Sequence, residues 1–500
     1  MGFTSSVFLF AFLPISLLCY WVADFITNKI GFFKSIRFND VILVFMSAVF
    51  YAWSCADHIV WLFLYIIMIY FLGMIIYKTQ NVYLRLPLYQ EKNDGFHPVP
   101  AFHLQILLFA VALLITLTIL LRYKYSDFFN RILNPYGLHV KSGMMAVAPM
   151  GISFIVFSSV SYLADIKNGK AQPGTFLDCM MYLTFFPKII SGPIVLWRDF
   201  KPQIGNPQIS LDNKLWGMNR ICIGFAKKVL LADIFGFTIS QIEYNGSYGI
   251  DTITVWITVL LYMLQIYYDF AGYSDIAIGL SQLLGISCKN NFNFPYRSLS
   301  ITEFWRRWHI SLGTWFKEYV YIPLGGSRKG LNRTMVNLTI VFMLTGFWHG
   351  AGWNYILWGA INTAAVLLDR LVMKKHSYAK VPSLIKWAGT MFIVMLFWQL
   401  FRYPTLHEAV DCIYAMFHAH TEPVTYTWKF FLDQRLVFLM VVGILGSTVL
   451  GSPIVLAKWQ KYQKYSVVFL VQELVLLVLV VLSIISVVSS TYSPFIYFQY

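Results

Sequence analysis

Long apolar runs alternate with short basic segments along most of this chain of 500 residues. The clearest runs are residues 7–21, 41–53, 59–77, 104–121 and 467–488. Since a helix of about 20 apolar residues crosses the hydrocarbon core of a bilayer, these runs indicate membrane-spanning helices. The apolar residues are continuous and do not alternate with polar ones, which excludes a membrane β-barrel. The pattern predicts an all-α polytopic fold with about 11–14 spanning or re-entrant helices.

Composition supports a membrane protein and argues against nucleic-acid binding. Hydrophobic residues make up 58% of the chain and charged residues only 12%, about half the charged share of an ordinary soluble protein. The net charge of +15 could suggest nucleic acid. However, basic residues such as Lys29, Lys34 and Arg37 lie between the apolar runs, as in cytoplasmic loops. We therefore expect lipid, and not nucleic acid, around this chain.

The first apolar run is expected to be a retained span, because no Lys or Arg precedes it and no small-residue cleavage site follows. The orientation of the chain across the membrane stays open. With the first two basic loops in the cytoplasm the N-terminus lies outside, and strict alternation then puts Arg122, Lys124, Arg131 and Lys141 outside as well. That placement opposes the positive-inside rule, so either one segment re-enters or the spans are counted wrongly.

No long linker or internal repeat divides the chain, and we expect one membrane-embedded domain from residue 1 to 500. Within it, residues 1–141 are expected to form peripheral spans, 142–400 the catalytic core and 401–500 C-terminal spans. Pro and Gly interrupt the apolar runs of the middle zone near residues 149–151, 187–188, 192–193, 295 and 323–326. Backbone groups freed by such breaks need protein or water partners. The clustered breaks favour a lined cavity, with simple kinks at helix ends as the alternative.

Two histidines in Trp-rich apolar sequence are the candidates for chemistry. His309 lies in Phe-Trp-Arg-Arg-Trp-His-Ile-Ser-Leu and His349 in Gly-Phe-Trp-His-Gly. An imidazole exchanges a proton near neutral pH, and desolvation keeps it in the neutral form that a general base needs. The alternatives are a core histidine bonded to a carbonyl for His349 and an interfacial belt histidine for His309. Both are predicted as catalytic residues that share one cavity, where His309 orients the acceptor or the donor carbonyl.

The sequence around the histidines predicts their local structure. Apolar residues at helical spacing from Trp305 to Phe316 indicate one amphipathic helix near the membrane interface. The Gly346-x-x-x-Gly350 spacing lets a neighbouring helix approach closely. The side chains predicted to contact substrate are Trp305, Trp308, Trp348 and Asn354.

Other polar residues have weaker indications. Asp269 and Asp275 lie deep in apolar sequence and need partners, for which the candidates are Arg297, Arg306, Arg307 and Lys188. A structural ion-pair or capping role is favoured over an acid–base site. The six cysteines are widely separated without metal-ligand spacing, so no metal or disulfide is expected. No nucleotide-binding P-loop or serine-hydrolase elbow occurs in the sequence. Residues 325–328, Gly-Gly-Ser-Arg, indicate a tight turn or, less clearly, a phosphate cradle.

In combination these motifs resemble the membrane-bound O-acyltransferase family, and within it the bacterial alginate O-acetyltransferase branch. The similarity covers nearly the whole chain. It is carried by Pro-Met-Gly-Ile-Ser-Phe from 149, Phe-Phe-Pro-Lys-Ile-Ile-Ser-Gly-Pro from 185, Tyr-Asp-Phe-Ala-Gly-Tyr-Ser-Asp from 268, Asn-Phe-Pro-Tyr-Arg-Ser from 293, Phe-Trp-Arg-Arg-Trp-His-Ile-Ser-Leu from 304, Tyr-Ile-Pro-Leu-Gly-Gly-Ser-Arg from 321, Phe-Trp-His-Gly-Ala-Gly-Trp-Asn from 347 and Ser-Pro-Phe-Ile-Tyr-Phe from 493.

The resemblance implies spans around a funnel and acyl transfer from a thioester to a hydroxyl, in the inner membrane of a bacterium. The donor would be acetyl-CoA or an acyl carrier, with no bound cofactor. His349 falls on the family's catalytic histidine and His309 on its second polar position. An extracytoplasmic acetyltransferase or other polysaccharide-modifying partner would receive the acyl group. Lys188 stands where the branch suggests an uncharged residue, a departure that could affect the donor side of the cavity.

The resulting hypothesis is O-acetylation of an exported or cell-envelope polysaccharide such as alginate. His349 would take the proton of the acceptor hydroxyl, and His309 or freed backbone N–H groups would stabilise the oxyanion. Three alternatives stay open at this point. They are D-alanyl transfer to teichoic acid, a transporter or flippase for a lipid-linked glycan, and a scaffold that recruits a modifying enzyme.

Overall fold

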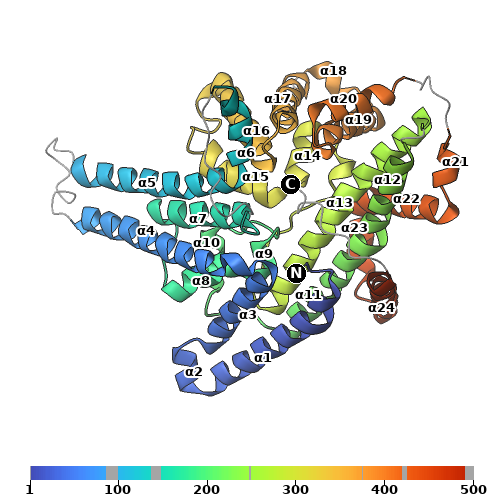
Figure 1. The fold of residues 1–500 in the computed structure, drawn as a ribbon. Coiled ribbons are helices and arrows are strands. Elements are labelled where there is room, and N and C mark those ends of the chain that lie inside the picture. The colour runs from blue at the N-terminus through green and yellow to red at the C-terminus, as the bar shows by residue number, and fades with distance from the viewer. Residues whose placement is uncertain are drawn as a thin grey trace. The chain divides into compact units, whose positions relative to one another are not determined.

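The computed structural model describes residues 2–85, 99–136, 148–246, 249–373, 375–418 and 425–489. These residues form helices and turns, and the β-type pairing found among them is an isolated bridge between Ile250 and Tyr426. The all-α prediction is therefore confirmed (Figure 1). The C-terminal motif at 493–498 and Lys141, both used in the sequence analysis, lie outside the described residues.

The chain divides into two compact units, each with segments that are distant in sequence. The first unit combines Phe3–Met218 with Ala277–Lys289, and the second combines Asn219–Ile276 with Asn290–Tyr500. These boundaries differ from the three zones expected from the sequence, and whether the chain acts as one domain stays a prediction. The two candidate histidines and their surroundings all belong to the second unit.

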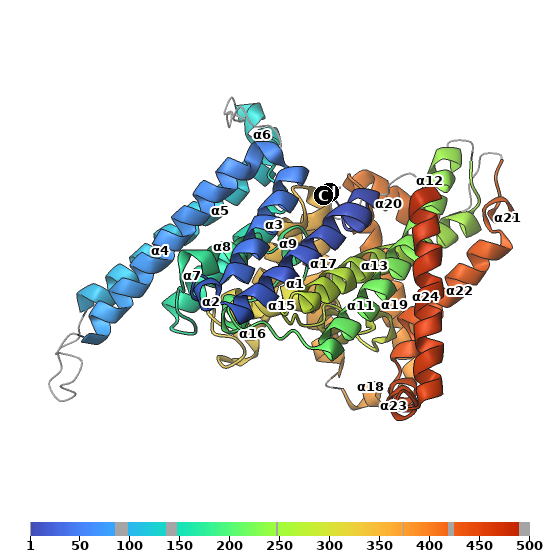
Figure 2. The ribbon, with the colours of Figure 1, turned by 90° about the horizontal axis from the view of Figure 1, so that it is seen from below.

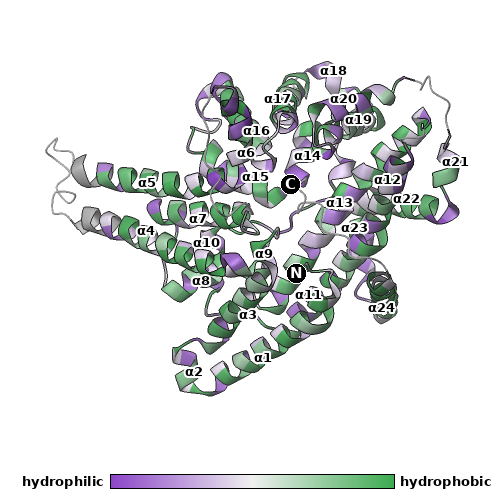
Figure 3. Cartoon of the chain, in the orientation of Figure 1, coloured by the Kyte–Doolittle hydropathy of each residue, from purple (hydrophilic) through white to green (hydrophobic). Residues whose placement is uncertain are grey.

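The first unit is built around a pair of long helices, α4 (Ile59–Arg85) and α5 (Val99–Lys124), which lie side by side and both contact α7 (Ile152–Lys167) (Figures 1 and 2). Its other elements are η1 (Phe8–Phe12), α1 (Leu13–Lys29), α2 (Gly31–Ser35), α3 (Phe38–Ser54), η2 (Ala56–His58), α6 (Ser126–Leu133), η4 (Asn134–Tyr136), α8 (Phe176–Thr184), α9 (Phe186–Ile189), α10 (Trp197–Phe200), η5 (Lys201–Gln203) and the start of α11 (Leu211–Phe225). Apolar residues cover much of α4 and α5 (Figure 3), as membrane burial requires.

The second unit holds the broken helices of the candidate site. Its elements are η6 (Ala226–Ala232), α12 (Asp233–Gly246), most of α13 (Thr252–Leu283), η7 (Pro295–Arg297), α14 (Ile301–Arg307), α15 (Ile310–Phe316), η8 (Lys317–Tyr321), α16 (Gly330–His349), α17 (Trp353–Met373), α18 (His376–Ala379), α19 (Ser383–Arg402), α20 (Leu406–Ala415), α21 (Trp428–Phe431), α22 (Gln434–Ser447), η9 (Val449–Gly451), α23 (Pro453–Tyr462) and α24 (Ser466–Ser489). In this unit α16 packs closely on α17, and α19 packs on α17 and α20.

Eight helices in the described part of the chain are long and apolar enough to cross a membrane. They are Phe8–Lys29, Ala56–Thr79, His103–Lys124, Thr252–Leu283, Trp353–Met373, Ser383–Arg402, Gln434–Gly451 and Ser466–Ser489. Helix α3 is apolar but shorter. A count of 11–14 spanning or re-entrant helices would need shorter elements such as α3 or α16 as well. Large apolar side chains such as Val467 and Leu470 on α24 are exposed, which suits contact with lipid.

The predicted Pro and Gly breaks coincide with real ends and turns. Gly151 precedes α7 with φ of +71°, a left-handed conformation that glycine adopts without cost. Gly192 lies so close to Lys188 that an added Cβ would sit 2.6 Å from the lysine Cα. After η8 the chain makes the tight turn expected at residues 325–328, where the Gly326 N–H donates to the Tyr321 carbonyl at 2.9 Å. These breaks separate short helices that could not otherwise pack.

Both buried aspartates of α13 form ion pairs, as expected, but the partners expected from the sequence were wrong. Asp269 contacts Lys228 at 2.8 Å. Asp275 contacts Arg220 at 2.7 Å and Lys227 at 2.6 Å. The partners lie on α11 and η6, where a π-helical turn directs two consecutive lysines to two different carboxylates. The separation of two residues along the sequence does not indicate whether they pair in the fold. The prediction that nearby arginines are the partners of these aspartates was therefore wrong.

The cations first proposed as partners have other environments. Arg307 pairs with Glu303 at 2.8 Å on its own helix, and Arg306 is exposed and lines a separate pocket with it. Lys188 belongs to the first unit, where its ammonium donates to Ser158 Oγ at 3.0 Å and lies 4.0 Å from the centre of the Tyr182 ring. Burial lowers the pKa of Lys188 to about 7. The expected effect of Lys188 on the donor side of the cavity stays a prediction.

Small residues set the contact between α16 and α17. A Cβ on Gly346 would lie 2.4 Å from the Tyr355 carbonyl oxygen, and one on Gly359 would lie 2.8 Å from the Phe342 carbonyl oxygen. The Gly346-x-x-x-Gly350 helix face was a wrong prediction, because α16 ends at His349 and Gly350 is extended. Glycine does permit a close helix contact here, but the contact is between Gly346 and Gly359 on α17.

Gly346→Ala should destabilise the protein by about 1–3 kcal/mol, because the added methyl group overlaps the backbone of α17. Thermal unfolding of the purified protein in detergent measures this loss. The matched control is Gly389→Ala on α19, where nothing lies within 4 Å of the new Cβ. That change should leave stability unchanged or raise it by up to about 1 kcal/mol. Equal melting temperatures for the two variants would contradict the packing described here.

Candidate functional site

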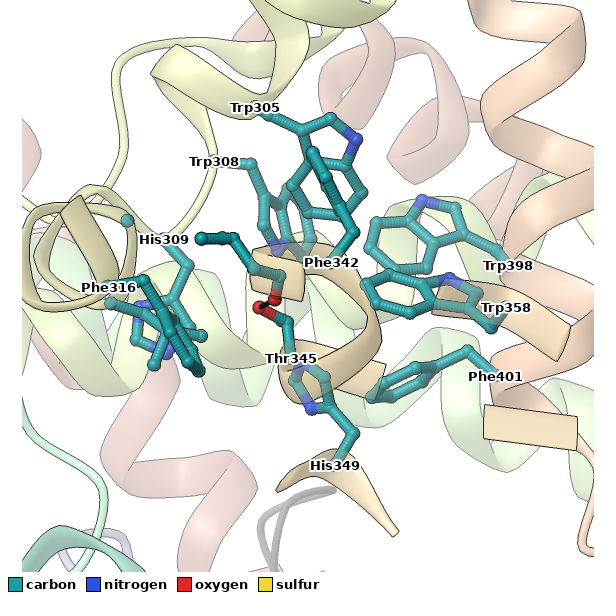
Figure 4. A pocket seen from close by; sticks show the side chains of 13 residues that line it. Trp305, Trp308, His309, Phe316, Phe342, Thr345, His349, Trp358, Trp398 and Phe401 are labelled. Carbon is teal, nitrogen blue, oxygen red and sulfur yellow. Dashed lines mark hydrogen bonds between the residues drawn. The ribbon is translucent and has the colours of Figure 1, made fainter. Parts of the chain in front are cut away.

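One pocket of the second unit brings the two histidines together. Its cavity of about 80 Å³ is lined by Trp305, Trp308, His309, Leu312, Gly313, Phe316, Val341, Phe342, Thr345, His349, Trp358, Trp398 and Phe401. These residues come from α14, α15, α16, α17 and α19 and from the break before α15. Figure 4 shows His309 beside Phe316 on one side and Trp358, Trp398 and Phe401 on the other, with His349 next to Thr345. The wall is aromatic, with few polar groups.

His349 is the last residue of α16, and aromatic rings hold its imidazole. The residue is 7% exposed. It lies edge-to-face with Phe401 at 4.9 Å and with Trp358 at 5.4 Å between centroids. Its chain neighbour Trp348 is 4.7 Å away. Such edge-to-face pairs restrict the orientation of the imidazole by packing, in a position where the helix end and the cavity meet.

His309 lies at a break that the sequence did not predict. The expected continuous amphipathic helix ends at Arg307 and resumes at Ile310. Between them His309 adopts φ of +45° and ψ of +54°, a left-handed conformation that is rare for residues with a Cβ. Holding such a residue costs about 1–3 kcal/mol, which the surrounding structure must offset. The surrounding structure therefore holds His309 in this strained conformation.

Asn291 supplies the contacts that hold the break. Its backbone carbonyl accepts the N–H of Ile310 at 2.9 Å. Its side-chain Oδ1 accepts the backbone N–H of Ser311 at 3.2 Å and the Ser311 hydroxyl at 2.9 Å. The same oxygen lies 3.0 Å from His309 Nδ1, and its Nδ2 donates to Ser274 Oγ at 3.1 Å. Asn291 thus connects α13, the histidine and the start of α15.

These contacts fix the tautomer of His309. A backbone N–H can only donate, so the Asn291 atom that it contacts must be the carbonyl oxygen, and His309 Nδ1 must carry the hydrogen. His309 Nε2 is buried with no hydrogen-bond partner among the described residues. In the neutral imidazole this nitrogen carries a lone pair. His309, a residue that lines the pocket, therefore has an unpaired acceptor nitrogen.

The imidazole of His309 stays neutral near neutral pH, so Nε2 remains an acceptor. His309 is 3% exposed and lies outside the eight candidate spans. Burial lowers the pKa of its imidazole to about 3, since desolvation disfavours the charged form. The ring also packs edge-to-face on Phe270 at 4.7 Å. A neutral acceptor at this position does not suit the expected role of donor to an oxyanion, but it does suit the orientation of a hydroxyl.

The other predicted contact residues divide into two groups. Trp305 and Trp308 line the pocket, and the Trp305 indole N–H donates to Asn362 Oδ1 at 3.1 Å. Trp348 packs between the histidine rings, 6.3 Å from His309, but does not line the cavity. Asn354 does not line it either. Its Nδ2 donates to the carbonyls of Leu400 and Tyr403, so Asn354 anchors the end of α19.

Sequence reasoning missed several residues of the site. Asn291 stands in a short segment without periodicity, and nothing in the sequence indicated its contacts. Trp398 and Phe401 come from α19, which composition describes as an ordinary span. Thr345 was visible as a polar residue one helical turn before His349, and its hydroxyl donates to the Val341 carbonyl at 2.7 Å. Its remaining lone pairs are available to a substrate donor.

The described part of the chain has no group of three or more His, Cys, Asp or Glu side chains placed to hold a metal ion. No acidic side chain is among the residues that line the histidine pocket. The polar groups on its wall are two imidazoles, one hydroxyl and indole N–H groups. This set can move a proton and can contact a neutral polar substrate group.

Comparisons with known proteins agree with this site. A family model described as MBOAT, membrane-bound O-acyltransferase family, matches residues 79–401. The chain is 35% identical over 425 residues to a probable alginate O-acetylase AlgI of Pseudomonas putida, covering 83% of this chain and 80% of that protein. It is 32% identical over 450 residues to a peptidoglycan O-acetyltransferase of Helicobacter pylori, covering 83% and 79%.

More distant similarity extends to a teichoic acid D-alanyltransferase of Bacillus subtilis, with 30% identity over 268 residues, 50% of this chain and 65% of that protein. All residues of the histidine pocket fall inside the segment that the family model matches. The helices long and apolar enough to span a bilayer agree with a multi-pass protein. This chain belongs to the membrane-bound O-acyltransferase family and is a membrane enzyme that transfers acyl groups.

Proposed function

We propose that this acyltransferase moves an acetyl group from a thioester donor to a hydroxyl of an exported or cell-envelope polysaccharide, with His349 as general base. The observation that carries the proposal is the shared pocket of His309 and His349. Two relatives that cover most of the chain are named for O-acetylation, one of alginate and one of peptidoglycan. The acceptor class proposed here is therefore a glycan with a free hydroxyl.

The lining of the pocket favours acetyl over D-alanyl. The cavity of about 80 Å³ suits a small acyl group, and both groups are small, but D-alanyl carries an ammonium. Burying an unpaired ammonium is costly, and no carboxylate lines this pocket. The D-alanyl alternative is accordingly disfavoured for this chain.

In the proposed reaction His349 accepts the proton of the acceptor hydroxyl while its oxygen attacks the acyl carbonyl. The new carbon–oxygen ester bond forms and the carbon–sulfur bond breaks. The proton on His349 then passes to the leaving thiolate, which restores the neutral imidazole. His309 Nε2, with its lone pair, accepts a hydrogen bond from a second hydroxyl of the acceptor sugar and so orients the sugar, since the one hydrogen of the attacking hydroxyl goes to His349. The aromatic wall excludes water, which would otherwise hydrolyse the thioester.

The setting of the reaction is proposed to be the inner membrane of a bacterium, since the relatives named above are bacterial. The thioester donor, acetyl-CoA or an acyl carrier, is proposed to enter from the cytoplasm. An extracytoplasmic polysaccharide-modifying protein is proposed as a partner of the enzyme. Membership of an acyltransferase family argues against the transporter and scaffold alternatives, which predict that His349 is dispensable.

His349→Gln should lower acetyl transfer by about 10²–10⁴-fold, the usual contribution of a positioned base. The measurement is ester-linked acetate on the exported polysaccharide, divided by the amount of enzyme in the membrane. His407→Gln is the matched control, because His407 is on the exposed surface of the same unit. It should keep normal activity. Unchanged acetylation in the His349 variant at equal membrane abundance would leave a transporter or scaffold as the better account.

Asn291→Asp should make activity sensitive to acid. A carboxylate beside Nδ1 favours the charged imidazole and raises the pKa of His309 from its value of about 3. Once protonated, Nε2 becomes a donor and no longer accepts from the sugar hydroxyl that it orients. Acetyl transfer at pH 6 should therefore fall relative to pH 8 in this variant, whereas the wild type shows no loss from His309 in that range.

The control for this pH profile is Asn213→Asp, which adds the same charge in the first unit, outside the pocket. Its profile should follow the wild type. A pH profile of Asn291→Asp identical to that of the wild type, at whatever absolute activity, would show that the charge state of His309 does not matter for transfer.

A further inference from the structure

A thiol and an imidazole lie next to each other in the first unit, outside the histidine pocket. Cys55 caps the end of α3, and His58 belongs to the short helix η2 that follows. The distance from Cys55 Sγ to His58 Nδ1 is 3.2 Å, a hydrogen bond between the two side chains. In such a pair the imidazole can take the proton of the thiol and leave a thiolate, which is the nucleophilic form of cysteine.

The burial around this pair also indicates chemistry. His58 is only 4% exposed, whereas Cys55 is half-buried. Among the described residues, His58 Nε2 has no hydrogen-bond partner, and neither has the buried hydroxyl of Tyr51, one helical turn before Cys55. Unpaired polar atoms are costly to bury and call for an explanation beyond packing. Two of them beside a partly accessible thiol are typical of a reactive site.

The pair lies at the boundary of the membrane. Cys55 directly precedes the candidate span Ala56–Thr79. The rings of His58 and Trp61 lie edge-to-face with Tyr123, at 6.3 and 5.7 Å between centroids, and Tyr123 is near the end of the span His103–Lys124. Trp and Tyr gather where the hydrocarbon core meets the headgroups. Cysteines in this position beside a span are the ones that accept acyl chains in thioester linkage.

An apolar cavity begins at the same end of α4. It has a volume of about 270 Å³ and is lined by Ala48 of α3, by five apolar residues of α4 and by Met180 and Thr184 of α8. The three helices contact one another. Thr184, the polar member of the wall, already donates its hydroxyl to the Met180 carbonyl at 2.8 Å. A cavity with such a wall suits hydrocarbon, because it offers water few partners.

The thiol and the cavity are close along the chain. Ile59 and Val60, which line the cavity, directly follow His58. The His58 backbone N–H donates to the Cys55 carbonyl at 3.2 Å, so the chain from Cys55 to the cavity wall makes a single tight turn. One turn of an α-helix advances about 5.4 Å. A long acyl chain is several times this length, so a chain attached to Sγ would extend well along the cavity wall.

We propose that Cys55 is an S-acylation site, at which His58 activates the thiol toward a long-chain acyl thioester and the apolar cavity takes the chain. His58 Nδ1 takes the thiol proton, and Sγ attacks the thioester carbonyl. A carbon–sulfur bond to Cys55 forms, the carbon–sulfur bond of the donor breaks, and the leaving thiolate takes the proton from His58. The products are acylated Cys55 and a free thiol. The proposal does not rest on the proposed function, because neither His309 nor His349 takes part.

The test uses the full chain in nanodiscs, with palmitoyl-CoA and acetyl-CoA as probes. Peptide mass spectrometry measures hydroxylamine-sensitive acyl groups on each cysteine over time. Cys288 is the internal control, since it is half-buried, belongs to the same unit and lies outside the candidate spans. Cys55 should gain palmitate about 10²-fold faster than Cys288, the low end of what a positioned base contributes. Equal rates at the two cysteines would overturn the proposal, and this comparison within the wild type needs no variant.

His58→Gln tests the base. It should slow palmitoylation of Cys55 by about 10²-fold or more and leave the slow reaction of Cys288 as it is. A rate at Cys55 equal to that of the wild type would remove His58 from the reaction and overturn the proposal.

Ala48→Phe tests the cavity. The added ring fills part of the space, so the ratio of palmitoyl to acetyl transfer at Cys55 should fall about tenfold. The matched control is Val49→Phe, since Val49 is half-buried on the same helix but does not line the cavity. It should keep the ratio of the wild type. The same ratio in both variants, or a wild type that takes acetyl as readily as palmitoyl, would contradict a long-chain acyl group in this cavity.

Discussion

The carboxamide of Asn291 is the contact on which the candidate site depends. Its single oxygen meets two N–H donors and one hydroxyl, and this allows the helix to break at a strained His309. At this break His309 lines the cavity as a neutral imidazole.

Neutral groups suit a buried site in a membrane enzyme, because burying an unpaired charge is costly. Buried charges in the second unit are confined to matched sets, in which Lys228 contacts Asp269 and Asp233, and Asp275 contacts two cations. The histidine pocket contains none. In the proposed reaction, proton transfer between a hydroxyl, an imidazole and a thiolate would take place against this aromatic wall.

The fold class, the multi-pass topology and the shared pocket of His309 and His349 could be predicted from sequence, because continuous apolar runs and polar residues within them are local signals. The contacts between distant side chains could not be predicted from sequence. Asp275 pairs with residues on another helix, and Asn291 acts through a tertiary hydrogen bond that has no sequence pattern. The helical spacing from Trp305 to Phe316 was a misleading signal, since one residue in the left-handed conformation overrides it. Asn354 had the polarity of a site residue but serves to anchor a helix end.

The most direct test of the account is a structure of the full chain in lipid with a non-reactive acetyl-thioether analogue of coenzyme A or phosphopantetheine. The account predicts that the acyl carbonyl lies between His309 and His349. An analogue bound with its acyl end outside the aromatic pocket, and with both imidazoles out of hydrogen-bonding reach of it, would contradict the account.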